Sequence, residues 1–190
     1  MSEDVLAAID SIKKLGVRVV INKDNCEIYG NGINGFKYRK NLTLNAKNSG
    51  TLGRLMLGLL IKSPQKIKLI GDKSLSKRDF SRVTVPLEKF GAKFYHKTKN
   101  KLPLSILGSQ SVKNIRYYEN KGSAQCKSSV MLAAVNALGT TFIKAKKSRN
   151  HTELLFKYLQ IPIKVKKTKK YDFIEIKNPK KIRAFNYEIP

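Results

Sequence analysis

Apolar residues recur at helical spacing in three short segments, and each segment ends in a break and continues as an alternating strand. In the first segment, Val5, Ile9 and Ile12 lie at the spacing that places side chains on one side of a helix. The predicted helix and strand pairs are residues 4–15 with 17–21, residues 82–90 with 92–95, and residues 152–159 with 161–165. The breaks fall at Gly16, Gly91 and Gln160, so the pattern repeats about every 70 residues.

A second type of helix alternates with the first. Residues 50–61 and 124–138 are apolar on most sides, as buried helices are. Each precedes an apolar strand, residues 67–70 or 140–145, and then a polar loop, residues 71–78 or 146–150. A hairpin is expected around residues 167–170, with Phe173, Ile174 and Ile176 in its return strand. The pattern therefore predicts an α/β protein built from repeated βαβαββ units.

The order of these elements predicts an array that is incomplete at both ends. Three full repeats would contain three buried helices, whereas the sequence shows two. We expect residues 1–190 to form one domain that lacks part of a repeat at each end.

Composition changes this picture mainly through charge. The 190 residues include 31 Lys and 8 Arg against 13 acidic residues, a net charge of +26. The lysines are scattered along the chain. This distribution indicates that the high charge comes from solvated surface lysines, as an AT-rich coding sequence produces, rather than from a dedicated polyanion site. The 8 Tyr and 8 Phe fall mostly in core-like patterns. We therefore expect no nucleic-acid partner, and a basic nucleic-acid-binding module remains an alternative.

The sequence also argues against a membrane span and a disulfide framework. The longest apolar run, residues 55–61, is far shorter than the roughly 20 residues that a spanning helix needs. Cys26 and Cys126 form neither a zinc spacing nor a disulfide pattern, so we expect reduced thiols in a cytoplasmic protein.

Two polar motifs begin the buried helices. In residues 47–54, Asn48 and Ser49 are good helix caps, and Gly50 leaves room for a ligand beside the backbone. The free N–H groups of such a helix end attract phosphate or carboxylate, and Arg54 follows one turn later. A plain capped helix is the alternative interpretation.

The second motif, residues 122–128, occupies the equivalent place in the next repeat. Ser123 can cap the helix or donate to a phosphate oxygen, and Gln125 offers both a donor and an acceptor. Cys126 is a poor candidate for a nucleophile because no His is placed to activate it.

The two polar loops carry further candidates. Arg78 can hold a phosphate or carboxylate through two N–H groups, and Ser148 precedes an outer helix. His151 and Glu153 lack a third ligand at metal spacing, so we expect no metal. Four anion-binding ends on one edge of the protein predict a site for negatively charged metabolites.

Four stretches of the sequence, in this order, resemble the EPSP synthase (3-phosphoshikimate 1-carboxyvinyltransferase) family: NSGTLGRLMLGLL, GDKSLSKRDFSRV, GSAQCKSSVMLAA and SRNHTELL. The resemblance covers essentially all 190 residues. It implies a fold with two lobes of three βαβαββ units each, an inside-out α/β barrel, of which this chain resembles most of the first. It also implies transfer of an enolpyruvyl group from phosphoenolpyruvate to the hydroxyl of shikimate-3-phosphate, with release of phosphate and without a cofactor.

The resemblance also assigns roles to residues. Gly50 and Arg78 match positions that contact phosphoenolpyruvate. Ser123, Ala124 and Gln125 match the run that binds shikimate-3-phosphate, and Gln125 matches a contact to both substrates. The resemblance further implies that Ser148 contacts the phosphate of shikimate-3-phosphate, and that Asn48 and Arg54 support the site.

The chain also departs from the family pattern. The family's early Lys-Ser…Arg motif and its second lobe have no counterpart here, so no catalytic residue is assigned in this chain. We expect weak substrate binding and no turnover by the 190 residues alone, and a monomer at full length. The alternative within the superfamily is UDP-N-acetylglucosamine enolpyruvyl transferase, whose active-site loop carries a Cys where this chain has Ser-Leu-Ser-Lys-Arg.

Overall fold

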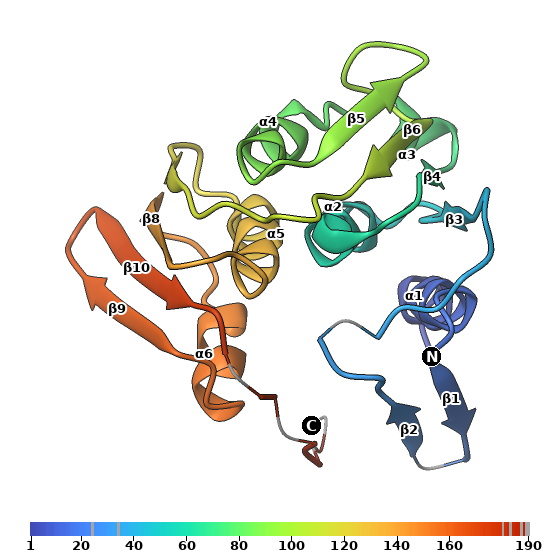
Figure 1. Ribbon diagram of the computed structural model, residues 1–190, viewed down its shortest axis with the longest axis horizontal. Coiled ribbons are helices and arrows are strands. Elements are labelled where there is room, and N and C mark those ends of the chain that lie inside the picture. The colour runs from blue at the N-terminus through green and yellow to red at the C-terminus, as the bar shows by residue number, and fades with distance from the viewer. Residues whose placement is uncertain (24, 34, 180, 183, 187, 189–190) are drawn as a thin grey trace.

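Two copies of one βαβαββ unit make up most of the fold (Figure 1). The computed structural model describes residues 1–23, 25–33, 35–179, 181–182, 184–186 and 188. The first unit comprises β3 (Thr43–Asn45), α2 (Gly50–Leu59), β4 (Ile67–Ile70), α4 (Ser81–Lys89), β5 (Lys93–His96) and β6 (Leu104–Leu107). The second comprises β7 (Arg116–Glu119), α5 (Ala124–Ala134), β8 (Thr140–Lys146), α6 (His151–Tyr158), β9 (Ile163–Lys167) and β10 (Tyr171–Lys177).

The two units have the same sheet topology. The strand orders are β3-β4-β6-β5 and β7-β8-β10-β9, and in each sheet the first two strands are parallel and the others antiparallel. Before them lie a helix and a two-stranded hairpin, α1 (Glu3–Lys14), β1 (Arg18–Ile21) and β2 (Cys26–Tyr29). The predicted βαβαββ repeat is therefore confirmed.

The sequence-based boundaries hold within a few residues, with two exceptions. The segment expected to be a polar loop at residues 71–78 contains a short helix, α3 (Lys73–Lys77), because Asp72 caps it by accepting from Leu75 N at 2.7 Å. The second buried helix ends at Ala134 rather than at residue 138. The first one, α2, continues as a 3-10 turn, η1 (Leu60–Lys62).

The two buried helices lie side by side at the centre, with α4, α1 and α6 around them and the two four-stranded sheets on the outside (Figure 1). A Cβ at Gly58 of α2 would collide with the carbonyl oxygen of Ser129 in α5, so glycine permits this close approach. Ser129 Oγ also donates to the Arg54 carbonyl oxygen at 2.7 Å. The packing fixes how the N-terminal ends of α2 and α5 are placed relative to each other.

Within the described part of the chain, no helix has the length and apolar character needed to cross a membrane.

Candidate active site

The N-terminal ends of α2 and α5 are both capped by serine, as the sequence predicts. Ser49 Oγ accepts from Leu52 N at 3.2 Å, and Ser123 Oγ accepts from Cys126 N at 3.3 Å. Each cap leaves other first-turn N–H groups without helical partners, and the helix dipole makes these ends attractive to anions. The candidate site therefore has two serine-capped helix ends, suited to anions, on neighbouring helices.

Two guanidinium groups converge over Gly50. A Cβ at this position would lie 2.7 Å from Arg54 Nη1 and 3.0 Å from Arg78 Nη1. Arg54 Nη1 donates to the Gly50 carbonyl oxygen at 3.2 Å, and burial lowers the pKa of Arg54. Arginine stays protonated despite such a shift, so both cations are present at neutral pH. Arg78 is exposed, and although its backbone N–H donates to the Leu75 carbonyl oxygen at 3.1 Å, its guanidinium makes no hydrogen bond or ion pair with the described residues.

Gln125 joins the two motifs. Its Oε1 accepts from Arg54 Nη1 at 2.8 Å, and its Nε2 donates to Thr51 Oγ1 at 2.7 Å. The first turn of α5 is thereby hydrogen-bonded to the first two turns of α2. Gly50, Arg54, Arg78 and Gln125 thus form one cluster, although the sequence separates them by up to 75 residues.

The short helix α3 holds Arg78 beside this cluster. Asp72 Oδ1 accepts from Leu75 N, and Asp72 Oδ2 accepts from Asn48 Nδ2 at 2.5 Å. The hydrogen bond from the Leu75 backbone is the main reason why the pKa of Asp72 lies below its usual value. Asn48, the residue before the Ser49 cap, is therefore hydrogen-bonded to the cap of α3, which ends at Lys77, directly before Arg78.

Glu119 organises the loop that leads into α5. It is buried, and its carboxylate accepts from three backbone N–H groups, of residues 121, 122 and 123, at 3.2, 2.6 and 3.0 Å. Arg82 Nη2 of α4 donates to the same carboxylate at 2.8 Å. The backbone at Ser123 and Ala124 is therefore held in place by a carboxylate that is itself paired with a charged group of the preceding repeat.

A buried ion pair holds the loop that carries Ser148. Lys127 is fully buried, and its Nζ lies 2.6 Å from Glu153 Oε1 and donates to the Arg149 carbonyl oxygen at 3.0 Å. Ser148 Oγ is buried and has no hydrogen-bond partner among the described residues. The loop also lies against Gly122, whose added Cβ would be 3.4 Å from the Lys147 carbonyl oxygen. Ser148 thus lies close to the α5 end of the site.

A pocket of about 160 Å³ lies between α2, α5 and the beginning of α6. Its lining residues are Thr51, Leu55, Ala124, Gln125, Ser128, Arg149, His151 and Thr152. Its lining is mostly polar, with hydroxyl, amide and guanidinium groups beside Leu55, and so suits a compact polar metabolite better than a flat aromatic one.

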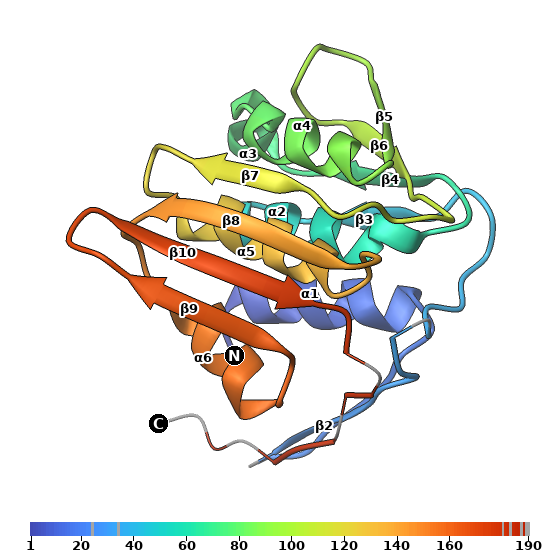
Figure 2. The ribbon, with the colours of Figure 1, turned by 60° about the vertical axis from the view of Figure 1, so that its left-hand side comes forward.

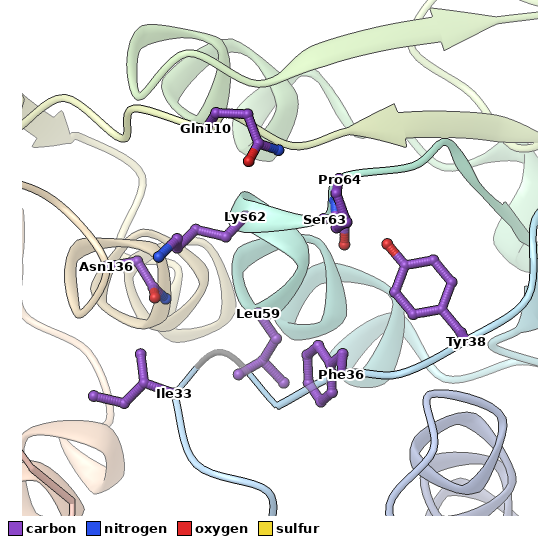
Figure 3. Close-up of a pocket in the computed structure, with 9 residues that line it drawn as sticks. All are labelled: Ile33, Phe36, Tyr38, Leu59, Lys62, Ser63, Pro64, Gln110 and Asn136. Atoms are coloured by element: carbon purple, nitrogen blue, oxygen red, sulfur yellow. The ribbon is translucent and has the colours of Figure 1, made fainter.

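A pocket of about 250 Å³ lies elsewhere and contains none of the predicted site residues (Figure 3). Figure 3 shows Lys62 next to Asn136 and Leu59 next to Phe36, with Ser63 and Tyr38 also in the lining. Leu59, Lys62, Ser63 and Asn136 lie at or just after the C-terminal ends of α2 and α5, so this pocket lies at the opposite end of the buried helices from Gly50 and Ser123.

Sequence reasoning missed the residues that hold the site together. Lys127 is buried because Glu153 supplies the opposite charge. A lone Lys inside an apolar helix, with a Glu in the first turn of the next helix, was the available signal. Glu119 had a comparable signal, as the acidic residue four positions before the Ser123 cap. Cys126 is buried, in agreement with a core role.

The comparisons with known proteins agree with one another. The family model for "EPSP synthase (3-phosphoshikimate 1-carboxyvinyltransferase)" matches residues 1–190. A 3-phosphoshikimate 1-carboxyvinyltransferase of Ruthia magnifica is 40% identical over 190 residues, which are 99% of this chain and 42% of the relative. One of Streptococcus mutans is 41% identical over 157 residues, 82% of this chain and 36% of the relative.

A solved structure of EPSP synthase from Acinetobacter baumannii superimposes with a TM-score of 0.85 at 32% identity. The match covers 96% of this chain and 40% of the solved one. The chain therefore spans about two fifths of the length of the proteins that it resembles.

Proposed function

Because the chain belongs to the EPSP synthase (3-phosphoshikimate 1-carboxyvinyltransferase) family, we propose that it forms one wall of a site for enolpyruvyl transfer. In this reaction the hydroxyl of shikimate-3-phosphate loses its proton as its oxygen forms a bond to the enol carbon of phosphoenolpyruvate, and the methylene carbon of phosphoenolpyruvate takes up a proton. Loss of a proton from that carbon and departure of phosphate then restore the double bond. The observation that carries the proposal is the convergence of Arg54, Arg78 and Gln125 at Gly50.

The phosphoenolpyruvate side of the site consists of Gly50, Arg78 and Gln125. The space above Gly50 is bounded by two guanidinium groups, which together can neutralise a phosphate or carboxylate. The guanidinium of Arg78 has no hydrogen-bond or ion-pair partner among the described residues, so its N–H groups are available to a ligand. Arg54 is already hydrogen-bonded to Gly50 and Gln125, so its role is to orient Gln125 and to add positive charge.

The shikimate-3-phosphate side consists of Ser123, Ala124, Gln125 and Ser148. Glu119 holds the backbone of the Ser123 loop, and the ion pair of Lys127 holds the loop of Ser148. Because these supports are buried, the binding groups would not need to be ordered when the substrate arrives. Ala124 can offer only its backbone.

Positioning and charge stabilisation are the contributions that this wall can make. Since the chain spans about two fifths of its relatives, we propose that residues 1–190 act as most of one lobe of a two-lobed site. The proton transfers would then depend on groups that face this wall. The 190 residues alone are expected to bind shikimate-3-phosphate weakly and to release no phosphate.

The location and assembly of the protein are also part of the proposal. Cys26 is exposed and Cys126 is buried, and both are free thiols, which is consistent with a reducing cytoplasm. We propose a monomer at full length, because the proposed site residues all lie within one chain.

Isothermal titration of the chain with shikimate-3-phosphate and with UDP-N-acetylglucosamine tests the proposed substrate. Heat that saturates with shikimate-3-phosphate and is lost in Gln125→Ala supports it. Preference for the nucleotide sugar would favour the other enolpyruvyl transferase. The loop at residues 74–78 argues against that outcome, because it contains no cysteine.

A further inference from the structure

The sheet β7-β8-β10-β9 exposes one complete face. Along β8 and β10, buried and exposed residues alternate, so every second side chain points away from the helices. Figure 2 looks onto this uncovered face, with α5 and α2 behind the strands. We call it the open sheet face and define it by the outward residues of its four strands: Arg116, Tyr118, Phe142, Lys144, Lys146, Lys164, Lys166, Tyr171, Phe173, Glu175 and Lys177.

Aromatic and cationic side chains alternate across this face. The strand registers place Tyr118 opposite Lys144, Lys144 opposite Phe173, and Phe173 opposite Lys166. One row across the four strands therefore reads Tyr, Lys, Phe, Lys. In the next row, Arg116 lies opposite Phe142, and its guanidinium carbon is 4.8 Å from the ring centroid.

The aromatic rings are available to a ligand. Tyr118 is 48% exposed, Phe173 41% and Phe142 36%. Lys144 Nζ lies 5.1 Å from the Tyr118 ring centroid, 4.5 Å from that of Tyr171 and 5.9 Å from that of Phe173. Cation–π contacts of this kind leave part of each ring in solvent while holding the ammonium group among them.

The charge of the open sheet face is strongly positive. Its outward positions include six Lys or Arg side chains and a single carboxylate, that of Glu175. The acidic residues of the same strands, Glu119 and Asp172, are buried on the opposite side. Such a surface attracts polyanions, and its exposed rings offer stacking partners that a simple salt-binding patch lacks.

The equivalent face of the other repeat lacks this combination. In sheet β3-β4-β6-β5, the comparable row is Thr43, Lys68, Ser105 and Tyr95. It contains one aromatic ring, Tyr95, with Lys66 Nζ 3.8 Å from its centroid. Because the two units share one topology, the aromatic and basic face is specific to the second unit and is not required by the fold.

We propose that the open sheet face binds single-stranded nucleic acid, with bases stacked on Tyr118, Phe142 and Phe173 and phosphates neutralised by the lysines between them. This is a binding surface additional to the proposed active site, which lies at the helix ends. A single strand fits because its bases are free to stack, whereas a duplex would present mainly phosphates. The sequence places most Tyr and Phe residues in core-like patterns, but these three are exposed, because a strand pattern alone does not show which face is covered.

The test is fluorescence anisotropy of the chain with a labelled 12-nucleotide strand of thymidines, at several salt concentrations. Tyr118→Leu with Phe173→Leu keeps apolar bulk and removes the rings, so binding should weaken roughly tenfold or more while the salt slope stays unchanged. Lys144→Gln with Lys166→Gln should make the binding constant less dependent on salt. The negative slope of log K against log salt should become shallower by about 0.7 for each phosphate that is no longer neutralised. The matched control is Tyr95→Leu with Lys68→Gln on the other sheet, which should leave binding unchanged.

Three further probes define the ligand. A duplex of the same length should bind more weakly than the single strand, and so should a polyphosphate of equal charge. A 12-nucleotide strand of uridines shows whether RNA or DNA is preferred. The proposal is supported if the thymidine strand or the uridine strand binds more tightly than the duplex. Equal affinity for duplex and single strand would overturn it, as would unchanged binding by the leucine variants with an unchanged circular dichroism spectrum.

Discussion

Arg54 Nη1 donates to Gln125 Oε1 at 2.8 Å, and this hydrogen bond joins the buried helix of one repeat to the buried helix of the next. Gln125 extends the connection to Thr51. The same amide therefore stands between a helix end flanked by two arginines and a helix end preceded by Ser123. This geometry is what a residue touching two anionic substrates would need.

Replacing Gln125 by Ala should weaken the site and, slightly, the fold. Two hydrogen bonds between α2 and α5 are removed, which corresponds to about 1–2 kcal/mol of unfolding free energy. Affinity for shikimate-3-phosphate should fall roughly tenfold in a calorimetric titration. Gln110→Ala, at an exposed position outside the site, is the matched control. Equal affinities of the two variants would remove Gln125 from the proposed binding site.

Replacing Gly50 by Ala should affect phosphoenolpyruvate more than shikimate-3-phosphate. The new Cβ would lie 2.7 and 3.0 Å from the ends of two flexible arginine side chains, which can move. Stability should therefore be unchanged or slightly higher, since Ala favours a helix over Gly by up to about 1 kcal/mol. Affinity for phosphoenolpyruvate, measured by chemical-shift titration, should fall because the guanidinium groups are displaced.

Gly30→Ala is the control for that variant, because a Cβ there meets nothing within 4 Å. A Gly50→Ala protein that bound phosphoenolpyruvate as tightly as the Gly30→Ala protein would show that the space above Gly50 is not used.

Breaking the buried ion pair should cost more stability than any change at the surface. In Lys127→Met, Glu153 remains buried without its partner, and the expected loss is about 3–5 kcal/mol in urea unfolding. Adding Glu153→Gln should recover part of this loss, because no uncompensated charge then remains. If the free energy of unfolding of Lys127→Met lay within about 1 kcal/mol of that of the unchanged protein, the buried pair would be contradicted. Typical surface substitutions cost no more than that.

Asp72 should contribute stability that depends on pH. Its pKa is lowered in the folded chain, mainly by the hydrogen bond from Leu75 N, so its contribution is complete above the unfolded pKa near 3.9. The contribution should be lost as the pH falls through the lower, folded pKa. The difference in unfolding free energy between the unchanged protein and Asp72→Asn should therefore be constant from about pH 5 to 8 and shrink below about pH 4. A difference that grew with acidity would show that the carboxylate is not acting as the cap.

The sequence predicts the repeat well because each element has its own periodicity and its own break. The break residues Gly16, Gly91 and Gln160 all have positive φ, which a helix that turns directly into a strand requires. The caps Ser49 and Ser123 could also be predicted, because each serine accepts a hydrogen bond from a backbone N–H group only three residues later in the sequence.

Contacts between distant residues could not be predicted in the same way. A lone Lys127 in an apolar helix signals that a partner is needed, but the sequence does not show that Glu153 lies beside it, and nothing near Gln125 shows that it reaches Thr51. Likewise, the alternation of β8 shows two faces but not which one the helices cover. Tertiary packing decides these points, and the resemblance to a family indicated only the residues of the site.

The most direct test of the central claim is a titration of the isotope-labelled chain with shikimate-3-phosphate, followed by the backbone amide signals. The proposal predicts saturable shifts at Ser123, Ala124, Gln125 and Ser148, and none on the β7-β8-β10-β9 sheet. Unchanged signals at these four positions at millimolar ligand, or shifts confined to other parts of the chain, would contradict it.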